Sequence, residues 1–158
     1  MQYQTFQHKK TNFMSKRRIY SFRDLEVYQR SSQLSAEVMS KVVPQLKEKQ
    51  YPLTEQMVEC SLNIPILITE AHARRFDDKN SSIEVLDKSM MNCNKMVAYL
   101  EQIKNIFGSN ADNVLYDELI KNYLATRSKM FNLFKAWKQF QVQDNSRTGI
   151  EKMQPQRS

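Results

Sequence analysis

Histidine and cysteine, the side chains that most often perform catalysis or bind transition metals, are scarce in this sequence. There are two of each: His8, His72, Cys60 and Cys93. His72 follows Glu70 by two residues, but a di-iron site in a helical bundle needs Glu-x-x-His, because only residues three or four apart share a helix face. Neither cysteine has a histidine at a recognisable position to activate it. The sequence therefore predicts a protein that is not an enzyme and that holds no metal and no cofactor.

Basic side chains within residues 121–140 form a second pattern. No acidic residue occurs in this stretch. At about 100° per residue of a helix, four of its cations project within about 120° of one another. These four are Lys121, Arg127, Lys135 and Lys138. Such a one-sided stripe predicts contacts with nucleic-acid phosphates. Three cations near the N-terminus would add to the binding, namely Lys16, Arg17 and Arg18.

The same stretch carries four aromatic residues spaced three apart, Phe131, Phe134, Trp137 and Phe140. Each step of three residues lags a full turn by about 60°, so the rings sweep about half of the helix circumference. One seam of a bundle cannot cover that arc. We expect core packing plus a subunit interface rather than base stacking, because stacking platforms are usually sheets or clefts. Arg75, which falls on an otherwise apolar seam, is a further interface candidate.

The composition indicates which elements position these side chains. The 158 residues include only two glycines and four prolines, too few for the turns of a β-sandwich or an α/β sheet. The two glycines are isolated, which also excludes a glycine-rich phosphate-binding loop. Leu, Met, Lys, Gln and Glu, which favour helix, are abundant. The sequence therefore predicts an all-α fold.

Hydrophobic spacing and capping residues predict four helices. We expect them over residues 21–43, 54–76, 81–108 and 112–141. Capping boxes open the first at Ser21 and the third at Ser81, Thr54 is the expected N-cap of the second, and Gly108 ends the third. The inward-facing positions include Ser32 and Met39 in the first helix and Phe140 in the fourth.

These lengths favour an antiparallel, up-down-up-down four-helix bundle over residues 21–141. Residues 1–20 are expected to form a flexible basic arm, and residues 142–158 a flexible tail.

Charge and hydropathy bear on partners and compartment. The net charge is +7, and residues 1–23 carry six basic side chains and no acidic one. This asymmetry favours a nucleic-acid partner, although a solvated tail would explain it too. No apolar run approaches the roughly 18 residues that span a bilayer, and no apolar segment follows the basic N-terminus. With two isolated cysteines, these features predict a cytoplasmic protein that has no membrane partner.

Two segments resemble a known family. One is Ser21-Phe22-Arg23-Asp24-Leu25-Glu26-Val27-Tyr28-Gln29, which is similar to the opening of the four-helix-bundle family encoded in 23S ribosomal RNA intervening sequences. The other is Leu62-Asn63-Ile64-Pro65-Ile66-Leu67-Ile68-Thr69-Glu70-Ala71, with Arg74 following, which resembles that family's Ile-Pro…Ile-x-Glu-Gly…Arg pattern. At Ala71 the sequence is more similar to the accessory variability determinant branch of diversity-generating retroelements.

This resemblance implies a homopentameric barrel of bundles whose basic surface binds nucleic acid and a reverse transcriptase. We therefore expect a non-catalytic accessory protein that binds RNA and DNA and docks a reverse transcriptase in a diversity-generating retroelement. The alternative is a protein-interaction scaffold, or a ribosomal RNA intervening-sequence protein, without a reverse-transcriptase partner.

Overall fold

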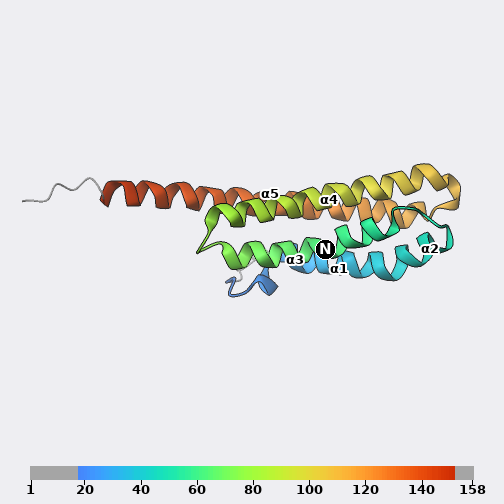
Figure 1. Ribbon diagram of the computed structural model, residues 1–158, viewed down its shortest axis with the longest axis horizontal. Helices are drawn as coiled ribbons and strands as arrows, with labels where there is room; N and C mark the ends of the chain where they lie inside the picture. Colours follow the sequence, from blue (N-terminus) through green and yellow to red (C-terminus); the bar gives the residue numbers. More distant parts are fainter. Residues whose placement is uncertain (1–17, 152–158) are drawn as a thin grey trace, which may run out of the picture.

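The computed structural model describes residues 18–151, apart from the side chains of residues 144 and 148–151, and contains only helices in this range (Figure 1). The predicted all-α class is therefore confirmed. Four long helical segments lie side by side. They are the run α1–η2–α2 and the helices α3, α4 and α5. Helix α1 packs on α3 and α5, and α4 packs on the same two helices, so the four segments surround one core.

The first segment starts at the predicted capping box. The Ser21 hydroxyl accepts from the Arg23 N–H at 3.2 Å, and the Asp24 carboxylate accepts from the Ser21 N–H at 3.0 Å. This box caps a short 3-10 turn, η1 (Phe22–Asp24), and helix α1 (Glu26–Glu37) begins after the extended Leu25.

The predicted end of this segment at Val43 is wrong. A π-helical turn, η2 (Val38–Val42), leads directly into α2 (Val43–Glu48), whose first turn contains Pro44. In the π turn, the Val43 N–H bonds to the Val38 carbonyl five residues back. A proline ring normally clashes with the carbonyl four residues before it, and the wider turn relieves that clash.

Helix α3 (Thr54–Arg74) matches the predicted extent and continues through Pro65. The N-cap is Leu53, so Thr54 is the first residue of the helix and not the predicted N-cap, and its hydroxyl donates to the Tyr51 carbonyl at 2.8 Å. Five residues of the predicted seam are fully buried, namely Met57, Ser61, Ile64, Ile68 and Ala71, and the sixth, Arg75, is half-buried.

Helix α4 (Lys79–Phe107) begins before the predicted Ser81. Asp78 caps it by accepting from the Ser81 N–H at 3.0 Å. It ends where predicted, at Gly108, which starts the 3-10 turn η3 (Gly108–Asn110) with a positive φ of 54°.

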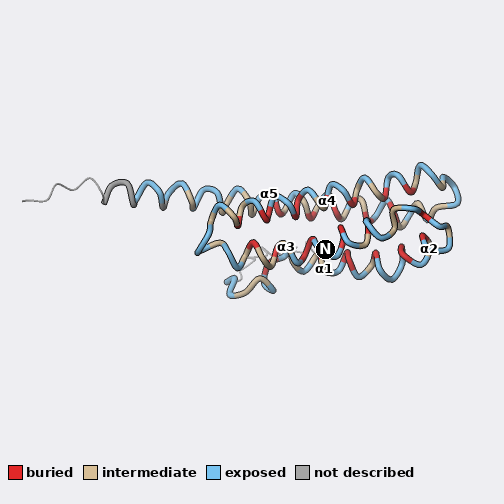
Figure 2. Tube along the Cα trace, viewed as in Figure 1, coloured by how far each residue is buried: buried red, intermediate tan, exposed pale blue. Residues whose placement is uncertain are grey.

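Helix α5 (Asn113–Glu151) continues past the predicted end at Gln141. The expected flexible tail is therefore wrong for residues 142–151, which are helical. Residues 152–158 lie outside the described residues, as do residues 1–17 of the predicted arm. Figure 1 shows α5 running beyond the bundle at the end where α3 connects to α4, and Figure 2 shows that this extension is largely exposed.

Small hydroxyl side chains hold the helices close together within the core. Ser82 and Ser89 of α4 donate to the Ala71 and Ile64 carbonyls of α3, at 2.7 and 3.0 Å. These bonds satisfy buried hydroxyls, which would otherwise destabilise the fold.

Two of the predicted inward positions, Met39 and Phe140, are wrong. In the first segment, Ser31 and Val38 are buried, whereas Ser32 is half-buried and Met39 is exposed. Phe140, next to the residue of α5 that bonds to the first turn of α4, is 70% exposed.

Candidate nucleic-acid interface

Helix α5 positions all four cations of the predicted stripe. Lys121, Lys135 and Lys138 are exposed on it. Arg127 is half-buried, and its Nε atom is buried without a hydrogen-bond partner, so this side chain is partly a component of the bundle wall. Of the three N-terminal candidates, Arg18 is exposed, and Lys16 and Arg17 lie outside the described residues.

Lys129 lies between Arg127 and Lys135 in the sequence, but its side chain forms an ion pair with another helix. Its ammonium lies 3.2 Å from the Glu26 carboxylate of α1. Hydrogen bonds from Arg30 and then from Lys129 lower the pKa of Glu26. Lys129 therefore binds α1 to α5 and contributes less positive charge to the surface.

The structure brings two of the predicted lysines onto two of the predicted aromatic rings. Phe131 and Phe134 stack with their centroids 6.2 Å apart and their planes inclined by 14°. The Lys135 ammonium lies 5.0 Å from the Phe131 centroid, and the Lys138 ammonium lies 5.2 Å from the Phe134 centroid. We call these four residues the lysine–phenylalanine cluster. Cation–π contact holds each ammonium at the surface next to an apolar ring.

The other two aromatic residues lie elsewhere on the helix. Phe131 and Phe140 are nine residues apart, so they project from α5 in directions about 180° apart. Trp137 is half-buried, and its ring lies 6.5 Å from that of His72 in α3. The four rings are therefore divided between two faces of α5, in agreement with the predicted wide arc.

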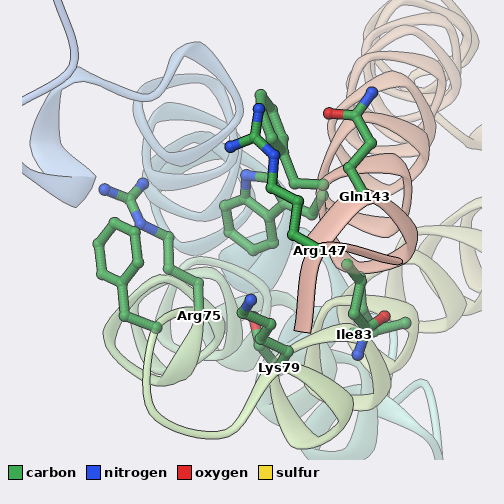
Figure 3. Close-up of a pocket in the computed structure, with 10 residues that line it drawn as sticks. Arg75, Lys79, Ile83, Gln143 and Arg147 are labelled. Carbon is green, nitrogen blue, oxygen red and sulfur yellow. The ribbon is translucent and has the colours of Figure 1, made fainter. Parts of the chain in front are cut away.

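Trp137 and Phe140 line a pocket of about 610 Å³ together with Arg75, which is another of the predicted interface residues. The pocket lies at the end of the bundle, between the α3–α4 connection and the extension of α5. Figure 3 shows Arg75, Lys79 and Arg147 around its opening. We call it the end pocket. None of its described lining residues is acidic.

Arg75 has an unusual environment in the end pocket. Its guanidinium lies 4.4 Å from the Phe76 centroid, and its Nε atom is buried without a hydrogen-bond partner. Burial lowers the pKa of Arg75. Burial, and then the charge of Arg75, also lower the pKa of His72. The end pocket therefore has a positive electrostatic character.

The buried thiols have environments that oppose nucleophilic chemistry. Burial raises the pKa of Cys60 to about 11 and that of Cys93 to about 12. Both thiols therefore stay protonated at neutral pH, and the thiolate is the reactive form. Within residues 18–151, no three side chains among His, Cys, Asp and Glu gather as metal ligands would.

Seven of the ten residues that line the end pocket escaped the sequence analysis, and the aromatic and cationic ones among them are Phe76, Lys79 and Arg147. A signal for Arg147 was available, since it stands seven residues after Phe140, on the same helical face. The argument from helical spacing applies to Arg147 only because α5 continues beyond Gln141, where the sequence predicted its end. Phe76 and Lys79 belong to the α3–α4 connection and the start of α4, where no periodic pattern applies.

No helix within residues 18–151 combines the length and the apolar character that crossing a bilayer requires. Comparison of the chain with protein-family models, with curated proteins and with solved structures found no match.

Proposed function

We propose that this protein is a non-catalytic accessory factor that binds RNA and DNA through α5 and docks a reverse transcriptase. The lysine–phenylalanine cluster is the observation that carries the proposal. Its two ammonium groups are exposed, close together and free of acidic neighbours within residues 121–140. Such a surface attracts phosphates by releasing their counterions, with little dependence on base sequence.

The positions along α5 support a binding surface longer than one phosphate. Lys121 precedes Lys135 by fourteen residues, which corresponds to about 21 Å along a helix axis. Arg127 lies between them. Cations over this length match several consecutive phosphates of a duplex, which are spaced by about 3.4 Å per strand.

The oligomeric part of the proposal is an antiparallel bundle assembled as a homopentamer. An apolar strip outside the core supports it. Met39 of η2 and Leu62 and Ile66 of α3 are exposed, and Met39 and Leu62 line one groove between the first segment and α3. Exposed apolar groups that gather in this way typically mark contacts between chains. Pentamer formation would repeat the α5 surface five times and increase avidity for a long polyanion.

The test is a fluorescence-anisotropy titration of a structured RNA and a duplex DNA, at about 50 and about 300 mM salt. We expect tight binding at low salt and weak binding at high salt. The double variant Lys135→Glu/Lys138→Glu should bind about tenfold more weakly or worse at low salt, with an unchanged melting temperature.

The matched control is Lys88→Glu/Lys95→Glu, which makes the same change in charge at two exposed positions of α4. It should bind almost as tightly as the wild type. Equal losses in the two double variants would mean that net charge alone governs binding. No binding by the wild type at low salt would contradict the proposal and favour a protein-interaction scaffold.

Light scattering on the same samples gives the mass of the assembly, and co-purification with a reverse transcriptase encoded beside the gene tests the docking.

A further inference from the structure

The end pocket exists because α5 is longer than the helices beside it. Where α3 ends at Arg74 and α4 starts at Lys79, α5 continues to Glu151. Beyond the start of α4, the side chains of α5 have no neighbouring helix. Gln141 donates to the Asn80 side chain at 2.6 Å, which ties the extension to the start of α4 and fixes one wall of the pocket.

Cations from separate elements converge on this space. Arg75 follows α3 and Arg147 comes from the α5 extension, and Figure 3 shows both around the opening. Phosphate oxygens pair with guanidinium groups through charge-assisted hydrogen bonds in a two-pronged geometry. The polar part of the end pocket therefore fits a phosphate.

The remaining wall is aromatic. Trp137 is half-buried, and Phe140 and Phe76 are 70% and 74% exposed in the structure. Rings presented in this way offer π faces to another flat ring system. A volume of about 610 Å³ falls within the 300–1,000 Å³ range that is typical of small-molecule sites.

We infer that the end pocket binds a nucleotide, with its phosphate held by Arg75 and Arg147 and its base against Trp137 and Phe140. The nucleotide is either free or the terminal unit of a strand. This inference goes beyond the proposed function and does not depend on it, because none of the four residues of the lysine–phenylalanine cluster lines the end pocket.

The test uses Trp137, the only tryptophan in the chain, as a fluorescent reporter within the pocket. Titration with adenosine 5′-monophosphate should change its emission to saturation. Adenosine and inorganic phosphate, which each lack half of the ligand, should bind at least about tenfold more weakly. An oligonucleotide with a 5′-phosphate, compared with the same strand without it, distinguishes a strand end from a free nucleotide.

Two variants probe the cations independently. Arg75→Gln and Arg147→Gln should each raise the dissociation constant for adenosine 5′-monophosphate about tenfold, as loss of a charge-assisted contact predicts. The matched control is Arg74→Gln, which removes a neighbouring arginine that pairs with Glu70 at 2.6 Å and does not line the pocket. It should bind like the wild type.

The Lys135→Glu/Lys138→Glu variant separates this inference from the proposed function. It should lose affinity for long RNA and DNA but keep its affinity for the mononucleotide. An emission that does not change up to about 5 mM nucleotide overturns the inference. So does a change that Arg75→Gln and Arg147→Gln leave intact. A fall in assembly mass caused by Phe140→Ala, without a response to nucleotide, would instead identify the pocket as a subunit contact.

Discussion

The hydroxyl groups of Ser61 and Tyr123 lie 2.9 Å apart in the centre of the bundle, and both residues are fully buried. The bond joins α3 to α5 across the core. Each hydroxyl gives the other a hydrogen-bond partner in place of water. Removal of one hydroxyl therefore leaves the other buried without this partner, which is unfavourable. It fixes the position of α3 relative to the first part of α5, the helix that also carries the lysine–phenylalanine cluster.

Tyr123→Phe should lower the free energy of unfolding by about 1–2 kcal/mol, because the Ser61 hydroxyl is left without this partner. Ser61→Ala should have a similar effect. The double variant should lose less than the sum of the two single variants, as a coupled pair requires.

Urea unfolding followed by circular dichroism measures these values. The control is Tyr99→Phe. Tyr99 is half-buried, the structure gives no hydrogen bond for its hydroxyl, and the free energy of unfolding should change by less than about 0.5 kcal/mol. Additive losses at Ser61 and Tyr123 would show that the two hydroxyls are not coupled.

Alkaline pH should destabilise the fold through the buried thiols. Burial raises the pKa of Cys60 and Cys93 from 9.0 to about 11 and about 12. Between pH 9 and the raised pKa of each thiol, the thiols of the unfolded chain have lost their protons whereas those of the folded chain keep them. The free energy of unfolding therefore decreases as pH rises. The stabilising contribution is complete below pH 9 and is lost as pH rises towards 11 and 12.

Urea midpoints measured between about pH 8 and pH 10 test this, since the tyrosines titrate mainly above that window. In the variant Cys60→Ala/Cys93→Ala, which starts from a lower stability, the pH dependence should be shallower. An equal slope in the variant and the wild type would assign the effect to other groups.

Gly108→Ala should destabilise the protein by about 1–3 kcal/mol through the backbone alone. Gly108 has φ 54° and ψ −124°, a region that residues with a Cβ atom rarely adopt. No atom lies within 4 Å of the place where a Cβ would stand, so a clash contributes nothing. Gly108→Asn should be similarly unfavourable, because the ψ value lies outside the left-handed helical region that asparagine tolerates. Thermal unfolding measures both, and a neutral Gly108→Ala would show that the α4–α5 connection relaxes easily.

The parts of this fold that could be predicted are those that depend only on residues close together in the sequence. The seam of α3 from Met57 to Ala71 follows from the spacing of its apolar residues, and the box at Ser21 follows from its pair of side chains. The end of the first segment could not be predicted, because Val43-Pro44 normally stops a helix. The π turn that accommodates Pro44 depends on packing of Val38 and Val42 in the core.

The site could be predicted in part for similar reasons. Lys135 and Lys138 each follow a phenylalanine by four residues, and that spacing places them over the Phe131 and Phe134 rings once the segment is helical. The end pocket could not be predicted, because it requires α5 to continue where its sequence has lost apolar periodicity. It also requires Arg75, from a distant part of the chain, to lie beside Trp137 and Phe140.

Ending the chain after Gln141 should separate the bundle from the end pocket. Every fully buried side chain that the structure describes precedes this point, so the melting temperature should change by no more than a few degrees. Helical circular dichroism should decrease because residues 142–151 are removed.

The truncated protein should also lose the Trp137 response to adenosine 5′-monophosphate, because Gln143 and Arg147 no longer line the pocket. It should keep its affinity for duplex DNA at low salt, because Lys121, Lys135 and Lys138 remain. A large drop in melting temperature would instead show that residues 142–151 stabilise the bundle itself.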